Sequence, residues 1–236
     1  MCTVIVRVNE SGGPVRMLAV RDEDPHRPWK AFGFHWAEHP EIVGVRDQLA
    51  GGAWLAADPK TERLGVIVNL DGVDIENSTT RGHLALGAAL GEPMPETITT
   101  LGFHLVAVND GEVEVTTWNG ETASSQMLEP GTHVITHAPV DDMRDPRTGS
   151  WLPAFAAANL DGDVWWREWA ELLERSAETP NAAEHAIIRD NHVHGYPTIT
   201  LLAAFLTIGA GEFDLTQLVL DEPGVWPAEP AWEKIL

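Results

Sequence analysis

Residues 102–137 read GFHLVAVNDGEVEVTTWNGETASSQMLEPGTHVITH, and this stretch decides the fold class. Asp110-Gly111, Asn119-Gly120 and Pro130-Gly131 divide it into short segments. Asp-Gly and Asn-Gly pairs favour tight hairpin turns because both positions tolerate a positive φ. The stretch therefore predicts a run of strands at residues 103–108, 113–118, 124–128 and 133–137.

Patterns on either side of this stretch predict the other elements. Residues 3–8 and 15–20 flank a turn at 9–13 and predict a hairpin at the start of the chain. Residues 21–40 contain several prolines and histidines and predict a loop with short extended pieces. The remaining predictions are strands at 53–57 and 64–69, helices at 78–90, 151–158 and 164–177, a last hairpin at 196–208 and 213–220, and an extended tail after residue 221.

Strands that pair locally, with a few helices inserted between them, favour an α+β fold with antiparallel sheets. With this many strands, two stacked sheets covered by helices are more probable than one open sheet. The chain of 236 residues has no low-complexity linker and no internal repeat. We therefore expect a single domain over residues 1–236.

Composition restricts the functional classes. The chain has 15 basic and 36 acidic residues, which gives a net charge of −21. Such a charge repels phosphate backbones and anionic lipid, so we expect neither nucleic-acid nor membrane-surface binding. No apolar run is long enough to span a bilayer, and the N-terminus has no basic region typical of a signal peptide, so the expected location is the cytoplasm. A single cysteine rules out an internal disulfide and a multi-cysteine metal site.

That cysteine is residue 2, which gives it a particular chemistry. Its side chain is small, so we expect Met1 to be removed and Cys2 to become the N-terminal residue. A free α-amine has a pKa of about 7.7–8.0 and is partly neutral near pH 8. It would take the proton of the thiol on the same residue, which makes Cys2 both nucleophile and base. The alternative is that Cys2 is a small buried apolar residue without a catalytic role.

The motifs that follow Cys2 resemble those of the NRDE family, also called the transport and Golgi organisation family. The similarity covers about two-thirds of the chain and fades after Trp151. It rests on the combined order of Met1-Cys2, Val20-Arg21-Asp22-Glu23, Gly44-Val45-Arg46-Asp47, Gly51-Gly52-Ala53-Trp54-Leu55, Val68-Asn69, Ser78-Thr79-Thr80-Arg81-Gly82, Gly102-Phe103-His104-Leu105 and Pro130-Gly131-Thr132-His133.

This resemblance implies an N-terminal-nucleophile hydrolase-like αββα sandwich, two antiparallel sheets flanked by helices, similar to penicillin V acylases and bile-salt hydrolases. It also implies an active site. Arg21 would hold the thiolate, and Asp22, or alternatively Asp24, would bind the α-ammonium group. Asn69 would bind the oxyanion through its amide.

The sequence departs from the family pattern at several motif positions. Val20 stands where the family has asparagine, and Val45 where it has glycine. The related acylases place an oxyanion-binding asparagine where this chain has His137. His137 would replace it as a donor, or the activity is altered or lost.

Several residues near these motifs are candidates for substrate binding. Trp29 and Trp54 would wall a pocket for a flat or acyl-chain ligand. Asp24 and His104 complete the expected substrate-binding set. His192 and His194 would share one face of a strand, the start of a zinc or iron site, but no third ligand is apparent and we expect no metal.

The sequence thus predicts an amidohydrolase with Cys2, Arg21, Asp22, Asn69 and His137 as catalytic residues, acting on a small N-acyl compound without a cofactor. The family resemblance also allows an alternative, a binding or trafficking protein on the same fold, for haem or for a lipid-like ligand such as an acyl-CoA. In that case Cys2 or a histidine would ligate the haem iron.

Overall fold

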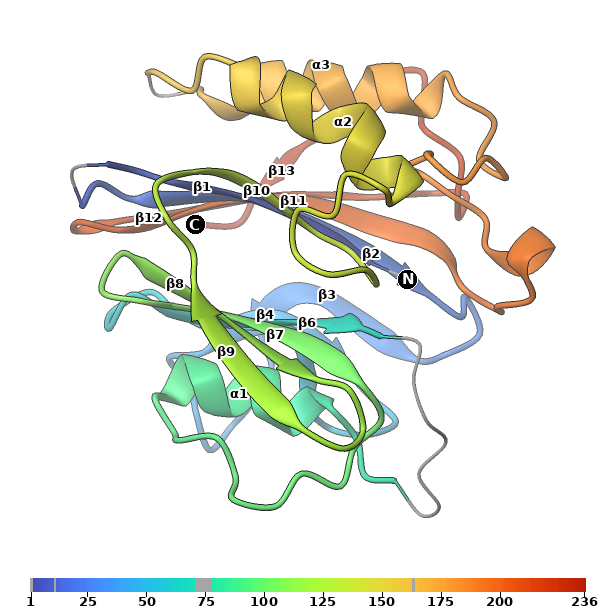
Figure 1. Cartoon of the computed structure of the whole chain (residues 1–236). Coiled ribbons are helices and arrows are strands. Elements are labelled where there is room, and N and C mark those ends of the chain that lie inside the picture. Colours follow the sequence, from blue (N-terminus) through green and yellow to red (C-terminus); the bar gives the residue numbers. More distant parts are fainter. Residues whose placement is uncertain (1, 11, 71–77, 163) are drawn as a thin grey trace.

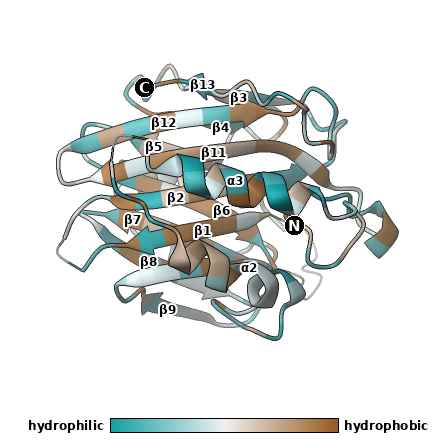
Figure 2. Cartoon of the chain, turned by 90° about the horizontal axis from the view of Figure 1, so that it is seen from above, coloured by the Kyte–Doolittle hydropathy of each residue, from teal (hydrophilic) through white to brown (hydrophobic). Residues whose placement is uncertain are grey.

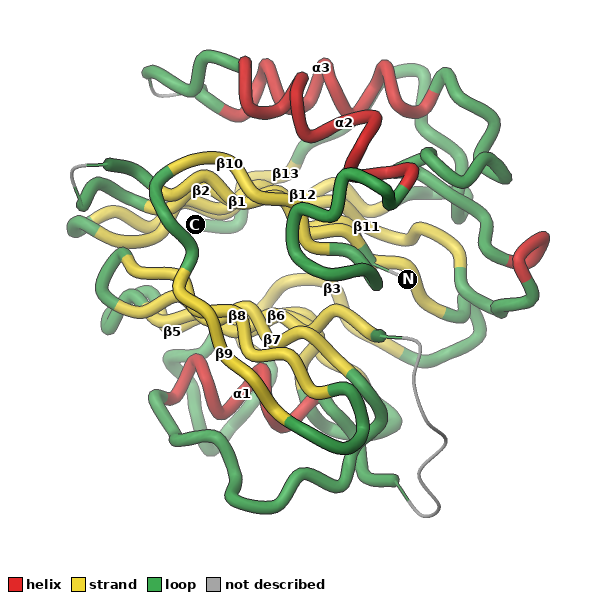
Figure 3. Tube along the Cα trace, in the orientation of Figure 1, coloured by secondary structure: helices red, strands yellow, loops and turns green. Residues whose placement is uncertain are grey.

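The computed structural model describes residues 2–10, 12–70, 78–162 and 164–236. They form four layers, in the order helices, sheet, sheet and helix (Figure 1). Helices α2 (Pro146–Ala157) and α3 (Trp166–Ala177) cover one sheet, and α1 (Gly82–Leu90) covers the outer face of the other. Figure 3 shows the strands of both sheets between these helices. The predicted α+β sandwich of two antiparallel sheets flanked by helices is confirmed.

The sheet under α2 and α3 has six strands, and every neighbouring pair is antiparallel. The predicted N-terminal hairpin and last hairpin lie in it side by side. The pairing of its two central strands places Asp22 opposite Thr200. In spatial order the strands are β10 (Gly131–Ile135), β1 (Thr3–Val8), β2 (Val15–Glu23), β11 (Ile199–Gly209), β12 (Glu212–Val219) and β13 (Glu233–Lys234).

The second sheet has seven strands whose spatial order follows the chain. Most strands pair with the next through a short antiparallel connection, whereas β6 and β7 pair across a long connection that contains α1. The Asp110-Gly111 turn has the positive φ values, 52° and 76°, that the sequence predicted. The strands are β3 (Trp29–Phe34), β4 (Val43–Asp47), β5 (Ala53–Asp58), β6 (Arg63–Asn69), β7 (Phe103–Asn109), β8 (Glu112–Trp118) and β9 (Ala123–Met127).

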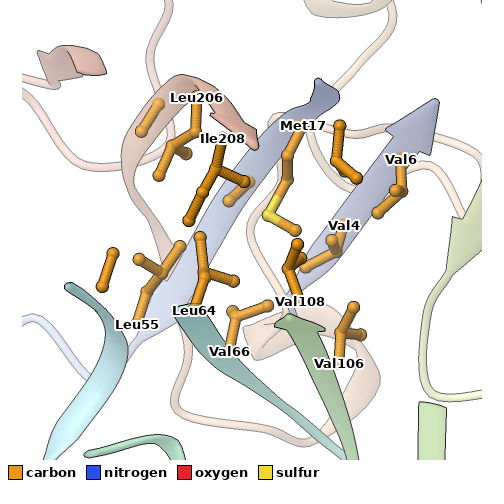
Figure 4. Close-up of a cluster of buried hydrophobic side chains, with 14 of the residues drawn as sticks. Val4, Val6, Met17, Leu55, Leu64, Val66, Val106, Val108, Leu206 and Ile208 are labelled. Atoms are coloured by element: carbon orange, nitrogen blue, oxygen red, sulfur yellow. The ribbon is translucent and has the colours of Figure 1, made fainter. Parts of the chain in front are cut away.

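Three apolar clusters hold the layers together. Side chains alternate along each strand, so Val4 and Val6 of β1 point between the sheets while Ile5 points toward α2 and α3. Figure 4 shows Val4 and Val6 with Met17 and Leu206 of the same sheet, facing Leu64 and its neighbours of the other sheet. Figure 2 shows α3 lying over the six-stranded sheet, with hydrophobic and hydrophilic segments alternating along the helix. A third cluster lies between α1 and the seven-stranded sheet.

Several predicted boundaries and one strand assignment were wrong. Residues 21–40 are loop with short extended pieces, as predicted: β2 continues to Glu23 through its pairing with β11, and β3 lies within this range. The chain also contains β4, which was not predicted. Strand β10 does not continue the local run of strands but crosses to the other sheet and pairs with β1.

The helices also differ in where they begin. Helix α1 begins at Gly82 and not at residue 78, and α3 begins at Trp166. Helix α2 begins at Pro146, five residues earlier than predicted, because Asp145 caps it by accepting a hydrogen bond from the amide of Thr148. No helix in the described part of the chain is long and apolar enough to cross a membrane.

Candidate active site

A cavity of about 450 Å³ lies where β2 and β6 end and β5 begins. It brings together five of the predicted site residues from separate parts of the sequence. They are Cys2, Arg21, Asp22, Trp54 and Asn69. Because the two sheets stack with these strand ends at the same edge, residues 67 positions apart in the chain meet around one space.

Cys2 precedes the first strand and lies deep in this cavity. The pairing of Thr3 with Val20 places it beside the end of β2. Its side chain is only 2% exposed, and its Sγ donates to the backbone oxygen of Asp22 over 3.6 Å. Burial raises the pKa of the Cys2 thiol above its ordinary value, and the nearby positive charge of Arg21 does not outweigh this effect.

The Asp22 carboxylate is held by residues that the motifs did not reveal. Thr200 donates to its Oδ1 over 2.7 Å, and Asn191 Nδ2 donates to its Oδ2 over 3.4 Å. Asp22 and Thr200 are both buried. The pairing of β2 with β11 creates this contact between residues that are 178 positions apart. In the sequence, the one signal for this contact was the position of Thr200 in the last predicted hairpin.

Arg21 and Trp54 form one wall of the cavity. The Arg21 guanidinium lies over the indole of Trp54, 5.4 Å from the ring centroid. Its Nη2 donates to Glu23 Oε2 over 3.0 Å, which forms an ion pair. These two contacts fix the arginine against the wall.

Asn69 is the last residue of β6, as predicted, and it lines the cavity from the seven-stranded sheet. Its backbone pairs with Phe103 of β7. Asn69 therefore belongs to the seven-stranded sheet, whereas Cys2 precedes a strand of the six-stranded sheet. The cavity is therefore bounded by both sheets.

Three arginines in or beside the site were not among the predicted site residues, although Arg81 belongs to one of the quoted motifs. Arg27 pairs with Asp47 through its Nε and Nη2, which lie 2.9 and 2.6 Å from Oδ2, and both residues line the cavity. Arg81 lines it from the start of α1. Arg147 of α2 does not line the cavity but lies behind Cys2 and donates to its backbone oxygen over 3.3 Å.

Arg147 is fully buried and also donates to the hydroxyl of Thr3. Burial is the main reason why its pKa falls to about 10, and the positive charge of Arg189 adds to this effect. The guanidinium nevertheless stays charged at neutral pH. A buried cation that binds the backbone oxygen of Cys2 and the side-chain hydroxyl of Thr3 fixes the position of the candidate nucleophile.

Four predicted residues lie outside this cavity. Asp24 caps a turn by accepting from the amide of His26 over 2.9 Å, and Trp29 begins β3 and packs against the core between the sheets. Asp22 rather than Asp24 therefore lines the cavity. His104 and His137 line a second cavity of about 410 Å³.

His104 has hydrogen-bond partners for both ring nitrogens. Nδ1 lies 2.8 Å from Thr117 Oγ1, and Nε2 lies 3.0 Å from the backbone oxygen of Ala138. Because the carbonyl must accept, Nε2 carries the proton and Nδ1 accepts from the threonine. Burial lowers the pKa of His104, so the ring is neutral at pH 7. His137 Nδ1 lies 4.0 Å from Asp145 Oδ2.

The predicted strand arrangement of His192 and His194 is wrong. The two histidines lie in a short 3-10 helix, so they do not alternate as residues of a strand would. His192 pairs with Asp190 over 2.6 Å. Within the described residues, no group of three or more histidine, cysteine, aspartate or glutamate side chains could hold a metal ion.

Comparison with known proteins agrees with the motif resemblance. No curated protein matches the chain. Residues 1–152 match the model of a protein family described as Transport and Golgi organisation 2. The match covers Cys2, Arg21, Asp22, Asn69 and Arg81 of the cavity, and the two-sheet architecture is compatible with an N-terminal-nucleophile hydrolase-like fold. The chain therefore belongs to the Transport and Golgi organisation 2 family.

Proposed function

We propose that this protein is a cysteine amidohydrolase that cleaves a non-peptide amide, an N-acyl bond, with Cys2 as nucleophile. The observation that carries the proposal is that Cys2, Arg21, Asp22 and Asn69 line one cavity of about 450 Å³. That volume suits a small ligand. Removal of Met1 is part of the proposal, because only then does Cys2 carry the α-amine that serves as base.

In the proposed reaction, Sγ of Cys2 forms a bond to the amide carbonyl carbon while its proton passes to the α-amine. The proton then moves to the leaving nitrogen as the carbon–nitrogen bond breaks, which leaves a thioester. Water hydrolyses the thioester and restores the thiol. Since burial raises the pKa of the thiol, it is protonated at rest and needs a base at the moment of attack.

The surrounding residues would support each charge that develops. Asp22, itself held by Thr200 and Asn191, would bind the α-ammonium group. The amide of Asn69 would donate to the oxyanion, a contribution that is worth about 3 kcal/mol where a single donor of this kind has been removed. Arg147 would position Cys2 through the backbone oxygen that it already contacts.

The test is a screen of N-acyl compounds against the wild type and against Cys2→Ala and Asp22→Asn. We expect both substitutions to abolish turnover, and Asp24→Asn to lower it much less because Asp24 lies outside the cavity. Unchanged turnover in Cys2→Ala would overturn the mechanism. A greater loss in Asp24→Asn than in Asp22→Asn would move the carboxylate role to Asp24.

A second function, binding of haem or of a lipid-like ligand without turnover, is favoured by one observation. Cys2 is 2% exposed and burial raises the pKa of its thiol, as expected for a cysteine that packs in the cavity wall without turnover. Haem titration followed by absorbance tests this alternative. If the protein binds haem, the Soret band shifts at micromolar protein, and Cys2→Ala alters that shift. An unshifted spectrum would contradict haem binding.

A further inference from the structure

The cavity around Cys2 contains charged side chains of both signs, and most of them already have a charged or polar partner. Arg21 pairs with Glu23, and Arg27 pairs with Asp47. The Asp22 carboxylate accepts from Thr200 and Asn191. These contacts leave one cavity cation to consider, which is Arg81.

Arg81 has no carboxylate within ion-pair distance among the residues that the structure describes. Within the described ranges its guanidinium makes one hydrogen bond, in which Nη1 donates to the backbone oxygen of Gly102 over 2.9 Å. A guanidinium has five N–H donors in a fixed plane, so the edge formed by Nε and Nη2 remains for another acceptor. That edge matches the two oxygens of a carboxylate.

The position of Arg81 is fixed by the backbone around it. Its carbonyl accepts from the amide of Leu84 over 3.0 Å at the start of α1. The next residue, Gly82, packs directly on Gly52, where an added Cβ would lie only 2.5 Å from the Gly82 carbonyl carbon. The helix start is therefore held against β5, and the half-buried guanidinium is anchored before any ligand arrives.

A half-buried cation without a carboxylate partner is unfavourable unless a ligand neutralises it. Burial lowers the pKa of Arg81, although the negative charge of Glu23 acts in the opposite direction. The chain has a net charge of −21, which disfavours a ligand with several negative charges. The single guanidinium of Arg81 in such an acidic protein suits a ligand with one negative charge.

We propose that Arg81 is the anion-binding residue of this cavity and that the substrate is an amide bearing a carboxylate, such as an N-acyl amino acid. This inference rests on the proposed function for the identity of the amide bond, but the anion site itself does not. Arg81 binds the carboxylate through the edge opposite Gly102, which places the amide within the same 450 Å³ cavity as Cys2.

The test separates binding from turnover by using the Cys2→Ala variant. Calorimetry measures its affinity for N-acylglycines from acetyl to decanoyl and for the matching glycinamides, which lack the negative charge. We expect the carboxylate ligands to bind at least about tenfold more tightly, since a charge-assisted hydrogen-bonded pair is worth this much. Adding Arg81→Gln should remove the preference, and Arg81→Lys should retain part of it because the charge remains without the fork.

The matched control is Arg144→Gln, because Arg144 is 88% exposed, pairs with Asp142 and does not line the cavity. It should leave the preference unchanged. Equal binding of acids and amides, a preference that survives Arg81→Gln, or no binding by any member of the series would overturn the inference. An Arg81-dependent preference without hydrolysis by the wild type would contradict the proposed amidase and leave the anion site standing.

Discussion

Replacing Thr200 by valine tests how the Asp22 carboxylate is held in the cavity. The substitution keeps the shape of the side chain and removes only the hydroxyl. That hydroxyl donates to Asp22 Oδ1 over 2.7 Å and accepts from the amide of Arg189 over 2.9 Å. Loss of a hydrogen bond to a charged group costs about 1.5–3 kcal/mol, and an unsatisfied buried N–H costs about 1–3 kcal/mol. We therefore expect Thr200→Val to lower the free energy of unfolding by roughly 3–5 kcal/mol.

The matched control is Thr200→Ser, which keeps the hydroxyl and removes one buried methyl group worth about 1 kcal/mol. The valine variant should therefore be less stable than the serine variant by about 2–4 kcal/mol. Urea unfolding at pH 7 measures the difference for both variants. Equal stability of the two would refute the claim that Thr200 holds Asp22.

Three further substitutions test other parts of the structure. The Cβ added by Gly52→Ala would lie 2.5 Å from the Gly82 backbone. We therefore expect this substitution to destabilise the protein by about 1–3 kcal/mol and to weaken ligand binding at the start of α1. An unchanged melting temperature would contradict this. The hydrogen bond from His133 to Asp141 raises the pKa of His133, so its stabilisation is present below the unfolded pKa of about 6.5 and is lost as pH rises through the folded pKa. The destabilisation by His133→Gln should accordingly be larger at pH 6 than at pH 9, and a pH-independent difference would disprove it. Asp145→Ala should cost about 1 kcal/mol through loss of the α2 cap, whereas Asp145→Asn should cost much less, as urea unfolding would report.

Local patterns predicted much of the fold because most strands pair with their sequence neighbours. The turn at Asp110-Gly111 and the apolar alternation around it are properties of a few adjacent residues. The crossing of β10 to β1 is different, since it joins segments more than 120 residues apart and no short pattern encodes it. The start of α2 was missed although Asp145-Pro146 is a recognisable cap followed by a first-turn proline.

Some residues of the candidate site could likewise be predicted from short motifs, and others could not. The motif resemblance selected Cys2, Arg21, Asp22 and Asn69, and the structure places them around one cavity. It did not reveal Thr200, which reaches Asp22 only through the pairing of β2 with β11.

The placement of other candidates depends on the fold in three dimensions. The sequence predicted both His104 and His137 as site residues. His104 lies on β7 and His137 follows β10, and both line the second cavity. The pKa of Cys2 also depends on burial, which no spacing of residues reports. Residue type and order were therefore informative, whereas depth and partners required the structure.

The central claim is that Cys2 is the nucleophile, and the most direct test is the mass of the acylated protein. The wild type and Cys2→Ala are incubated with an N-acyl p-nitroanilide, quenched in acid and analysed intact and after proteolysis. We expect loss of Met1 and an added acyl group on the peptide that begins at Cys2, with no adduct in Cys2→Ala. A retained Met1, or an acyl group that is absent from Cys2 or persists in Cys2→Ala, would contradict it.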